Sequence, residues 1–186
     1  MVDCNKQKEE DLLKENKQTS EDLQRKLYFL CEQLQKMVQA LPQKYQQRIP
    51  NELLNGLAES LLDNTLIGIV NHLMDIQHVT EKQLFQQRLH FMNKQTLEVQ
   101  EMLISEIDEA SKAAQRLLLK ERHKQELVEF DKKIILELDQ KVYDQQRILE
   151  MAGVPGFEVT SDPAKIQVQI RLLDFILRLS QIEMPF

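Results

Sequence analysis

The sequence predicts an all-α, elongated helical protein with coiled-coil segments, and three observations support this class. Among its 186 residues only 4 are glycine and 5 are proline, and none is tryptophan. Glutamine, glutamate, lysine and leucine are abundant, and these residues lose little side-chain freedom in a helix. Apolar residues also recur every three or four positions, as helices with one buried face require.

The N-terminal part is predicted to contain a charged segment followed by a coiled-coil helix. Residues 1–19 are dense in charge, and we expect them to be partly disordered. Residues 20–41 carry a heptad repeat in which steps of four and three alternate: Leu23, Leu27, Leu30, Leu34, Met37 and Leu41. This narrow stripe is typical of a seam that faces one other helix. It could pack on this chain's own core or on a partner chain, and the pattern leaves both interpretations open.

Residues 42–79 are predicted to form a short helical core. Pro42 and Pro50 each disfavour helix at the preceding residue, so the segment between them fits a single helical turn. The residues from 51 to 79 then carry a wider apolar face, which is typical of a globular core.

One long helix is predicted over residues 80–151, where the sequence has neither proline nor glycine. Its start matches a capping box, with Thr80 as the cap and Gln83 three positions later. The first part of its apolar stripe contains Phe85, Leu89, Met92, Thr96, Val99, Leu103 and, further on, Leu117. The distal part contains Val128, Ile135, Leu138, Val142 and Leu149.

The middle of this predicted helix is its weak zone. Two successive steps of four, from Val99 to Leu103 to Ile107, interrupt the heptad repeat, and Lys120–Lys124 place charges on the stripe. A straight helix would be about 108 Å long, which no small domain covers. Either this rod pairs with a second chain, or the helix folds back near the weak zone into an intramolecular antiparallel pair. The sequence favours the rod, because only Ser105 and Ser111 resemble turn residues.

Residues 152–186 are predicted to form a loop and a C-terminal helix. Gly153 lies just past the long helix, and Pro155 prevents its continuation. Asp162 and Pro163 then provide a cap and a first helical residue. We expect this last helix to fold back on the end of the long one.

Several classes of function have little support. No nucleotide-binding, zinc-protease or nucleophile motif occurs, so we expect no enzyme and no cofactor. His72, Asp75 and His78 do not converge on one face, so we expect no metal site. No apolar run approaches the roughly 20 residues that span a bilayer, and the charged N-terminus does not resemble a secretory signal. We therefore expect a soluble, intracellular protein, cytoplasmic or nuclear.

Three segments resemble the family of the gonadal protein of flies and its vertebrate relatives from the DiGeorge syndrome critical region. These are LPQKYQQR at residues 41–48, the segment 61–84, and above all KIILELDQKVYDQQRILEMAGVPGFEVTSDP at residues 133–163. The resemblance implies a non-enzymatic, helical, coiled-coil protein connected with development. It implies no catalytic or ligand-binding residue.

The leading hypothesis is a coiled-coil interaction or adaptor protein. It would form a homo-oligomer or a hetero-complex with protein partners through the heptad seams. The alternative is a nucleic-acid-associated regulatory protein that uses the basic positions of the long helix. The net charge of −6 and the acidic residues among those positions count against this alternative.

Overall fold

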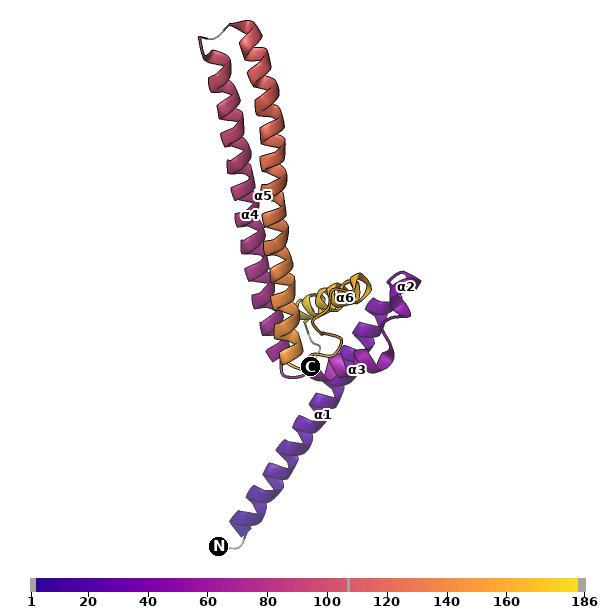
Figure 1. Ribbon diagram of the computed structural model, residues 1–186. Helices are drawn as coiled ribbons and strands as arrows, with labels where there is room; N and C mark the ends of the chain where they lie inside the picture. Colours follow the sequence, from indigo (N-terminus) through magenta and orange to yellow (C-terminus); the bar gives the residue numbers. More distant parts are fainter. Residues whose placement is uncertain (1–2, 107, 184–186) are drawn as a thin grey trace. The chain divides into compact units, whose positions relative to one another are not determined.

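The structure is a computed structural model that describes residues 3–106 and 108–183, with side chains described from Ser20 onward. The described part of the chain is built from helices and contains no strand, so the predicted all-α class is confirmed (Figure 1). Its helices are α1 (Asp3–Gln39), α2 (Gln43–Gln46), α3 (Asn51–Ser60), α4 (Thr65–Ile104), α5 (Glu109–Met151) and α6 (Pro163–Ser180).

The chain divides into two compact units, which we call the core unit and the hairpin unit. The core unit comprises the chain up to His72 together with the chain from Gln146 onward. The hairpin unit comprises Leu73–Gln145 and therefore contains most of α4 and α5.

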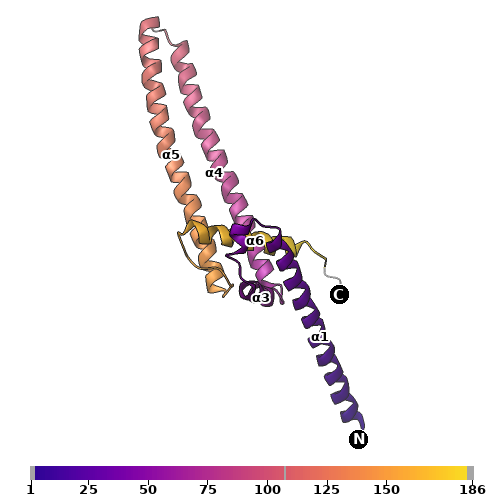
Figure 2. The ribbon, with the colours of Figure 1, turned by 90° about the vertical axis from the view of Figure 1, so that its right-hand side faces the viewer.

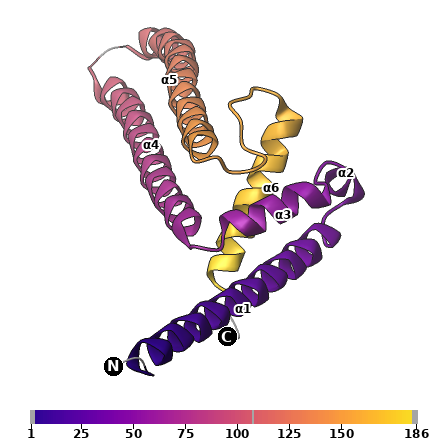
Figure 3. The same ribbon diagram turned by 90° about the horizontal axis from the view of Figure 1, so that it is seen from below.

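The core unit is organised around the leucine stripe of α1, which lies alongside α3 (Figure 3). Leu30 and Leu34 on α1 have no exposed surface, and neither has Leu57 on α3. Between α1 and α3, the two prolines confine α2 to a single turn, as predicted. The turn after α3 is held by Lys26, whose Nζ donates to the carbonyl oxygen of Leu62 at 2.6 Å. The heptad positions of α1 are therefore largely occupied by this chain's own core.

In the C-terminal part of the core unit, the helix end and the helix cap lie where the sequence predicts them. Gly153 adopts a positive φ of 69° where α5 ends. At the start of α6, the Asp162 carboxylate accepts a hydrogen bond from the amide of Ala164 at 2.9 Å, and Pro163 follows as the first helical residue. Helix α6 contacts the end of α5 through buried Gln146, whose Nε2 lies 2.9 Å from Oε1 of Gln169. The predicted fold-back of the last helix onto α5 is confirmed.

The bounds of the long helix differ from the prediction. Helix α4 begins at Thr65 and passes through Thr80 without interruption. In this position the Thr80 hydroxyl donates to the carbonyl oxygen of Ile76 at 2.9 Å, instead of capping a helix start. The capping-box pattern has no effect here, because the amides after Thr80 lie inside a continuous helix and already have carbonyl partners.

The predicted continuous helix over residues 80–151 is interrupted between Ile104 and Glu109, so the alternative of a fold-back is the one observed. The Ser105 hydroxyl donates to the carbonyl oxygen of Met102 at 2.6 Å, where α4 ends. The Asp108 carboxylate then accepts from the amide of Ser111 at 3.0 Å and caps α5. The hydrogen bonds from the Ser111 side chain and then from its amide lower the pKa of Asp108. Ile107 lies outside the described residues.

The loop before α6 yields a stability prediction that compares two glycines with positive φ. A Cβ atom at Gly156 would lie 2.7 Å from Cδ1 of Leu172, which is fully buried, whereas a Cβ atom at Gly153 would have no neighbour within 4 Å. Both alanine variants place an L residue in the left-handed region, at a cost of about 1–2 kcal/mol. Gly156→Ala should lose roughly 1–3 kcal/mol more because of overpacking. Urea unfolding measures both changes, and equal losses would contradict the tight packing at Gly156.

Candidate functional site

The hairpin unit consists of α4 and α5 running side by side in opposite directions (Figures 1 and 2). Contacts along its length show this arrangement, because α4 residues of increasing residue number contact α5 residues of decreasing residue number. The cross-helix pairs are Gln77 with Gln145 at 2.7 Å, Arg88 with Asp131 at 2.7 Å, Gln95 with Glu126 at 3.2 Å, and Glu98 with His123 at 2.8 Å. We call the row of positions that makes these contacts the inner seam.

Ion pairs determine the register of the inner seam. The guanidinium of Arg88 donates to both carboxylate oxygens of Asp131, at 2.7 and 3.0 Å. This pairing lowers the pKa of Asp131 and raises the pKa of Arg88. Farther along, hydrogen bonds from Arg122 and then His123 lower the pKa of the Glu98 carboxyl. A fork-shaped pair can form only with its partner directly opposite, so a slip of one helical turn would break these bonds.

The apolar part of the inner seam is small. The rings of Phe91 and Phe130 stack with their centroids 4.5 Å apart. Within the hairpin unit, Leu73 and Leu84 are the buried hydrophobic residues among those described, at 6% and 4% exposed. The polar partners alternate with half-buried apolar residues such as Leu127 and Ile134, so the apolar surface between the two helices is only partly removed from water.

Much of the hairpin's apolar surface is exposed instead. Eight large side chains with exposed fractions between 39% and 70% form a stripe beside the inner seam on both helices. On α4 they are Phe85, Leu89, Met92 and Leu103, and on α5 they are Leu117, Val128, Ile135 and Val142. We call this set the apolar face.

Both stripes lie on the same side of the hairpin. Phe85 follows buried Leu84 by one position, and Ile135 follows half-buried Ile134 by one position, so each stripe is rotated by about 100° in the same sense from the inner seam. Two antiparallel helices are related by a 180° rotation about an axis normal to the plane that contains them. Equal rotations away from the inner seam therefore bring both stripes to the same side of that plane. Leu103 and Leu117 accordingly line one shared surface hollow of about 650 Å³.

The opposite side of the hairpin is mostly charged. A second hollow there is lined by residues of both helices, among them Lys94, Glu101, Arg122 and Glu126, together with the exposed Leu97. Arg122 forms ion pairs with Glu98 and Glu126. This side is therefore richer in ion pairs than the apolar face, although it also exposes Leu97 and Leu118.

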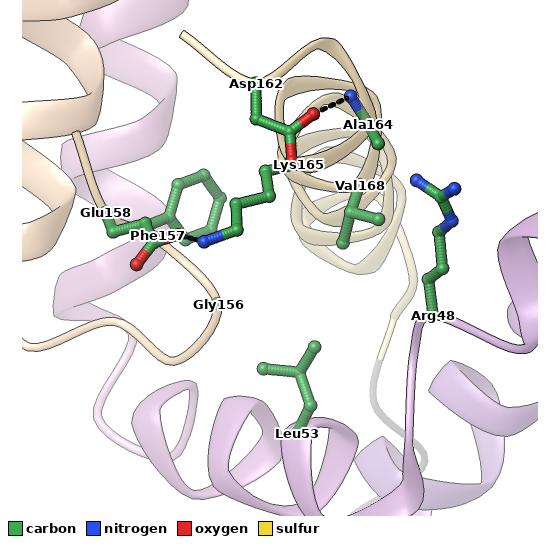
Figure 4. A pocket seen from close by; sticks show the side chains of 9 residues that line it. All are labelled: Arg48, Leu53, Gly156, Phe157, Glu158, Asp162, Ala164, Lys165 and Val168. Carbon is green, nitrogen blue, oxygen red and sulfur yellow. Dashed lines mark hydrogen bonds and ion pairs between the residues drawn. The ribbon is translucent and has the colours of Figure 1, made fainter. Parts of the chain in front are cut away.

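The core unit contains a separate pocket of about 500 Å³ beside the start of α6 (Figure 4). Its carboxylates already have structural partners: Glu158 accepts from Lys165 at 2.5 Å, and Asp162 caps α6. The ion pair raises the pKa of Lys165. Arg48 and the apolar Leu53 complete the opposite wall. We find no nucleophile and base positioned together in this pocket, and no group of metal-ligating side chains among the described residues.

Comparison with known proteins tests the family resemblance suggested by the segments singled out in the sequence. Residues 8–185 match the family described as DiGeorge syndrome critical region 6 (DGCR6) protein. The chain belongs to the DGCR6 family. It is 44% identical over 158 residues to "Gonadal protein gdl" of Drosophila melanogaster, covering 84% of this chain and 81% of that protein. It is 42% identical over 169 residues to "Protein DGCR6" of Gallus gallus, covering 84% of each.

The resemblance inferred from the sequence is thereby confirmed, although the DGCR6 family name assigns no molecular function. No solved structure matches the chain. No helix in the described part is long and apolar enough to cross a membrane.

The seam residues predicted for this DGCR6-family chain fall into three groups by exposure. Leu30, Leu34 and Leu149 are buried in the core unit, and Leu27, Met37, Leu41 and Leu138 are half-buried. Leu23, Val128, Ile135 and Val142 are exposed. The exposed α5 residues share the apolar face with the exposed stripe of α4, so the structure joins these two stretches of sequence.

The sequence analysis missed the inner seam, because it searched for apolar periodicity. The signal that could have revealed it is polar: Arg88 and Asp131 have complementary charges, as do Glu98 and Arg122. A search for nested pairs of opposite charges on the two sides of one turn would have indicated the antiparallel pairing.

The ion pairs of the inner seam predict how the hairpin responds to acid. The pKa values of Glu98 and Asp131 are lowered in the folded chain, so their stabilisation is present above the unfolded pKa values and is lost as the pH falls through the folded ones. Thermal unfolding followed by circular dichroism at neutral and acid pH should show a smaller acid loss for Glu98→Gln than for the unmodified chain.

Glu101→Gln is the matched control for this prediction, because Glu101 lies on the same helix and has no hydrogen bond or ion pair to another described residue. Its acid loss should equal that of the unmodified chain. Identical pH dependence in both variants and the unmodified chain would show that the Glu98 cluster does not hold the hairpin.

Proposed function

We propose that this chain is a non-enzymatic helical interaction protein whose apolar face binds a helical protein partner, giving it an adaptor role. The observation that carries the proposal is the imbalance within the hairpin unit. Its two buried leucines contrast with the eight exposed large side chains of the apolar face. Exposed apolar patches of more than a few hundred Å² on one side of a protein typically mark interaction sites.

The geometry of the apolar face suits a helical partner. Its side chains form two parallel ridges, one on each helix, and a third helix can pack its own apolar stripe into the groove between such ridges. Burying an apolar area on the order of 500 Å² is worth about 12 kcal/mol before the cost of association. That cost is estimated at about 4–15 kcal/mol, so the face can contribute net affinity.

The nucleic-acid alternative gains no specific observation. Arg122 is paired with Glu98 and Glu126, and Lys132 is paired with Glu129 at 2.6 Å. These two cations are neutralised within the hairpin, and acidic residues interleave with the remaining basic positions. The protein-interaction function is therefore the one we propose.

A substitution on the apolar face tests this function. Phe85→Glu places a charge within the proposed interface, at one end of the α4 stripe, so the chain isolated with its native partners should lose mass in size-exclusion chromatography coupled to light scattering. Helicity should be unchanged, because Phe85 is 67% exposed and contributes little to folding.

Leu97→Glu is the control for Phe85→Glu, because Leu97 is exposed on the same helix but lines the charged side. This variant should keep the mass of the native assembly. Equal behaviour of the two variants would refute the apolar face as the binding site.

A further inference from the structure

We propose that the partner on the apolar face is a second copy of this chain, with the two hairpins face to face and antiparallel. This inference rests on the proposed function and names the occupant of the same surface. In the resulting four-helix arrangement, α4 lies against the partner's α4 and α5 against the partner's α5. The two-fold axis is perpendicular to the helices, so the tip of each hairpin, where α4 and α5 connect, meets the base of the other.

The apolar area is large enough for a dimer. The exposed portions of the eight side chains amount to an area on the order of 500 Å². A standard interface buries roughly 800 Å² per partner, of which a little over half is apolar. Self-association of one continuous face therefore meets the requirement without a contribution from any other surface.

The charges on the apolar face distinguish a second copy from an unrelated helix. They lie on α5, three or four positions from the apolar residues. Lys120 and Lys124 flank the tip half of the face, and Asp139 flanks the base half, whereas Asp131 is held by Arg88 in the inner seam. Between Phe85 and Leu103, the matching positions of α4 are uncharged: Leu89, Met92, Thr96 and Val99.

This distribution is self-complementary in only one of the two face-to-face arrangements that two-fold symmetry permits. An axis parallel to the helices would place α5 on the partner's α4, so Lys120 and Lys124 would be desolvated against uncharged residues. An axis perpendicular to the helices places α5 on the partner's α5 in the opposite direction. Lys120 then lies within about one helical turn of the partner's Asp139, while the uncharged stripe of α4 meets its own copy.

The position of the axis follows from the extent of the face. On α5 the face runs from Leu117 to Val142, and Val128 lies near its middle. On α4 it runs from Phe85 to Leu103, and Met92 lies near its middle. The two copies of Val128 should therefore approach each other at the axis. The two copies of Leu117 should be about 33 Å apart, at opposite ends of the dimer.

Sedimentation equilibrium of the purified chain alone tests whether a second copy of the chain binds the apolar face. The unmodified chain should form a dimer, and Phe85→Glu should raise the dimer dissociation constant by at least about tenfold, as expected for a buried aromatic anchor. Leu97→Glu should leave the constant within about twofold of the original. A dimer that responds equally to both substitutions, or a chain that is monomeric at all concentrations, would overturn the proposal.

The failure of this proposal can be distinguished from the failure of the proposed function. If the purified chain is monomeric but its native assembly still loses mass with Phe85→Glu, a different protein occupies the face and only the self-association is wrong. If neither the purified chain nor the native assembly responds to Phe85→Glu, the proposed function is wrong as well.

Cysteine cross-linking tests the antiparallel geometry. Both native cysteines, Cys4 and Cys31, are first replaced by serine. Oxidation should then link Val128→Cys chains into a covalent dimer, because a disulfide requires Cα atoms about 4.4–6.8 Å apart. Leu117→Cys should remain unlinked at the same exposure to oxidant. Preferential linking at Leu117→Cys, or no linking at Val128→Cys, would overturn this arrangement.

Charge reversal tests the recognition directly. Replacing Lys120 and Lys124 with glutamate should weaken self-association, because an acidic residue would then meet the partner's Asp139. Mixing this variant with Asp139→Lys should favour the mixed dimer over the reversed homodimer, since opposite charges face each other again. A reversed variant that dimerises as well as the unmodified chain would contradict the role of these charges.

Discussion

The pairing of Arg88 with Asp131 across the inner seam is the interaction on which the arrangement of the hairpin unit depends. Its fork geometry fixes the rotation of both helices, because the two hydrogen bonds form only when these residues face each other. The Glu98 cluster nearer the tip enforces the same register. Once polar residues occupy the seam, the apolar residues one position later in the sequence must point away from it. The apolar face is thus a geometric consequence of a polar seam.

A polar seam contributes specificity more than stability. Exposed ion pairs are worth little in water, and the side chains of Arg88 and Asp131 remain 39% and 36% exposed. The two-helix unit therefore has only a thin layer of packed side chains between its helices. Covering the apolar face with further helices would add to that layer. The same physical argument links the composition of the inner seam to the proposed need for a partner.

The core unit shows the opposite solution. There the heptad leucines of α1 pack against α3, and Leu30, Leu34 and Leu57 are removed from water completely. Buried residues of this kind stabilise the folded chain and cannot serve a partner without unfolding it. Two stripes with the same periodicity thus have different roles in one protein. The roles differ because α3 packs against the stripe of α1, whereas no described helix of the hairpin unit covers the apolar face.

The sequence by itself determined the helical class, the single turn between Pro42 and Pro50, the end of α5 at Gly153 and the capped start of α6. These are local features, set by proline, glycine and the cap within a few residues. Only the tertiary structure decided that Thr80 lies inside α4, that the chain reverses between Ser105 and Asp108, and that Phe85 and Ile135 share one face. Periodicity shows that a helix has an apolar side, but long-range contacts such as Arg88 with Asp131 decide which way that side turns.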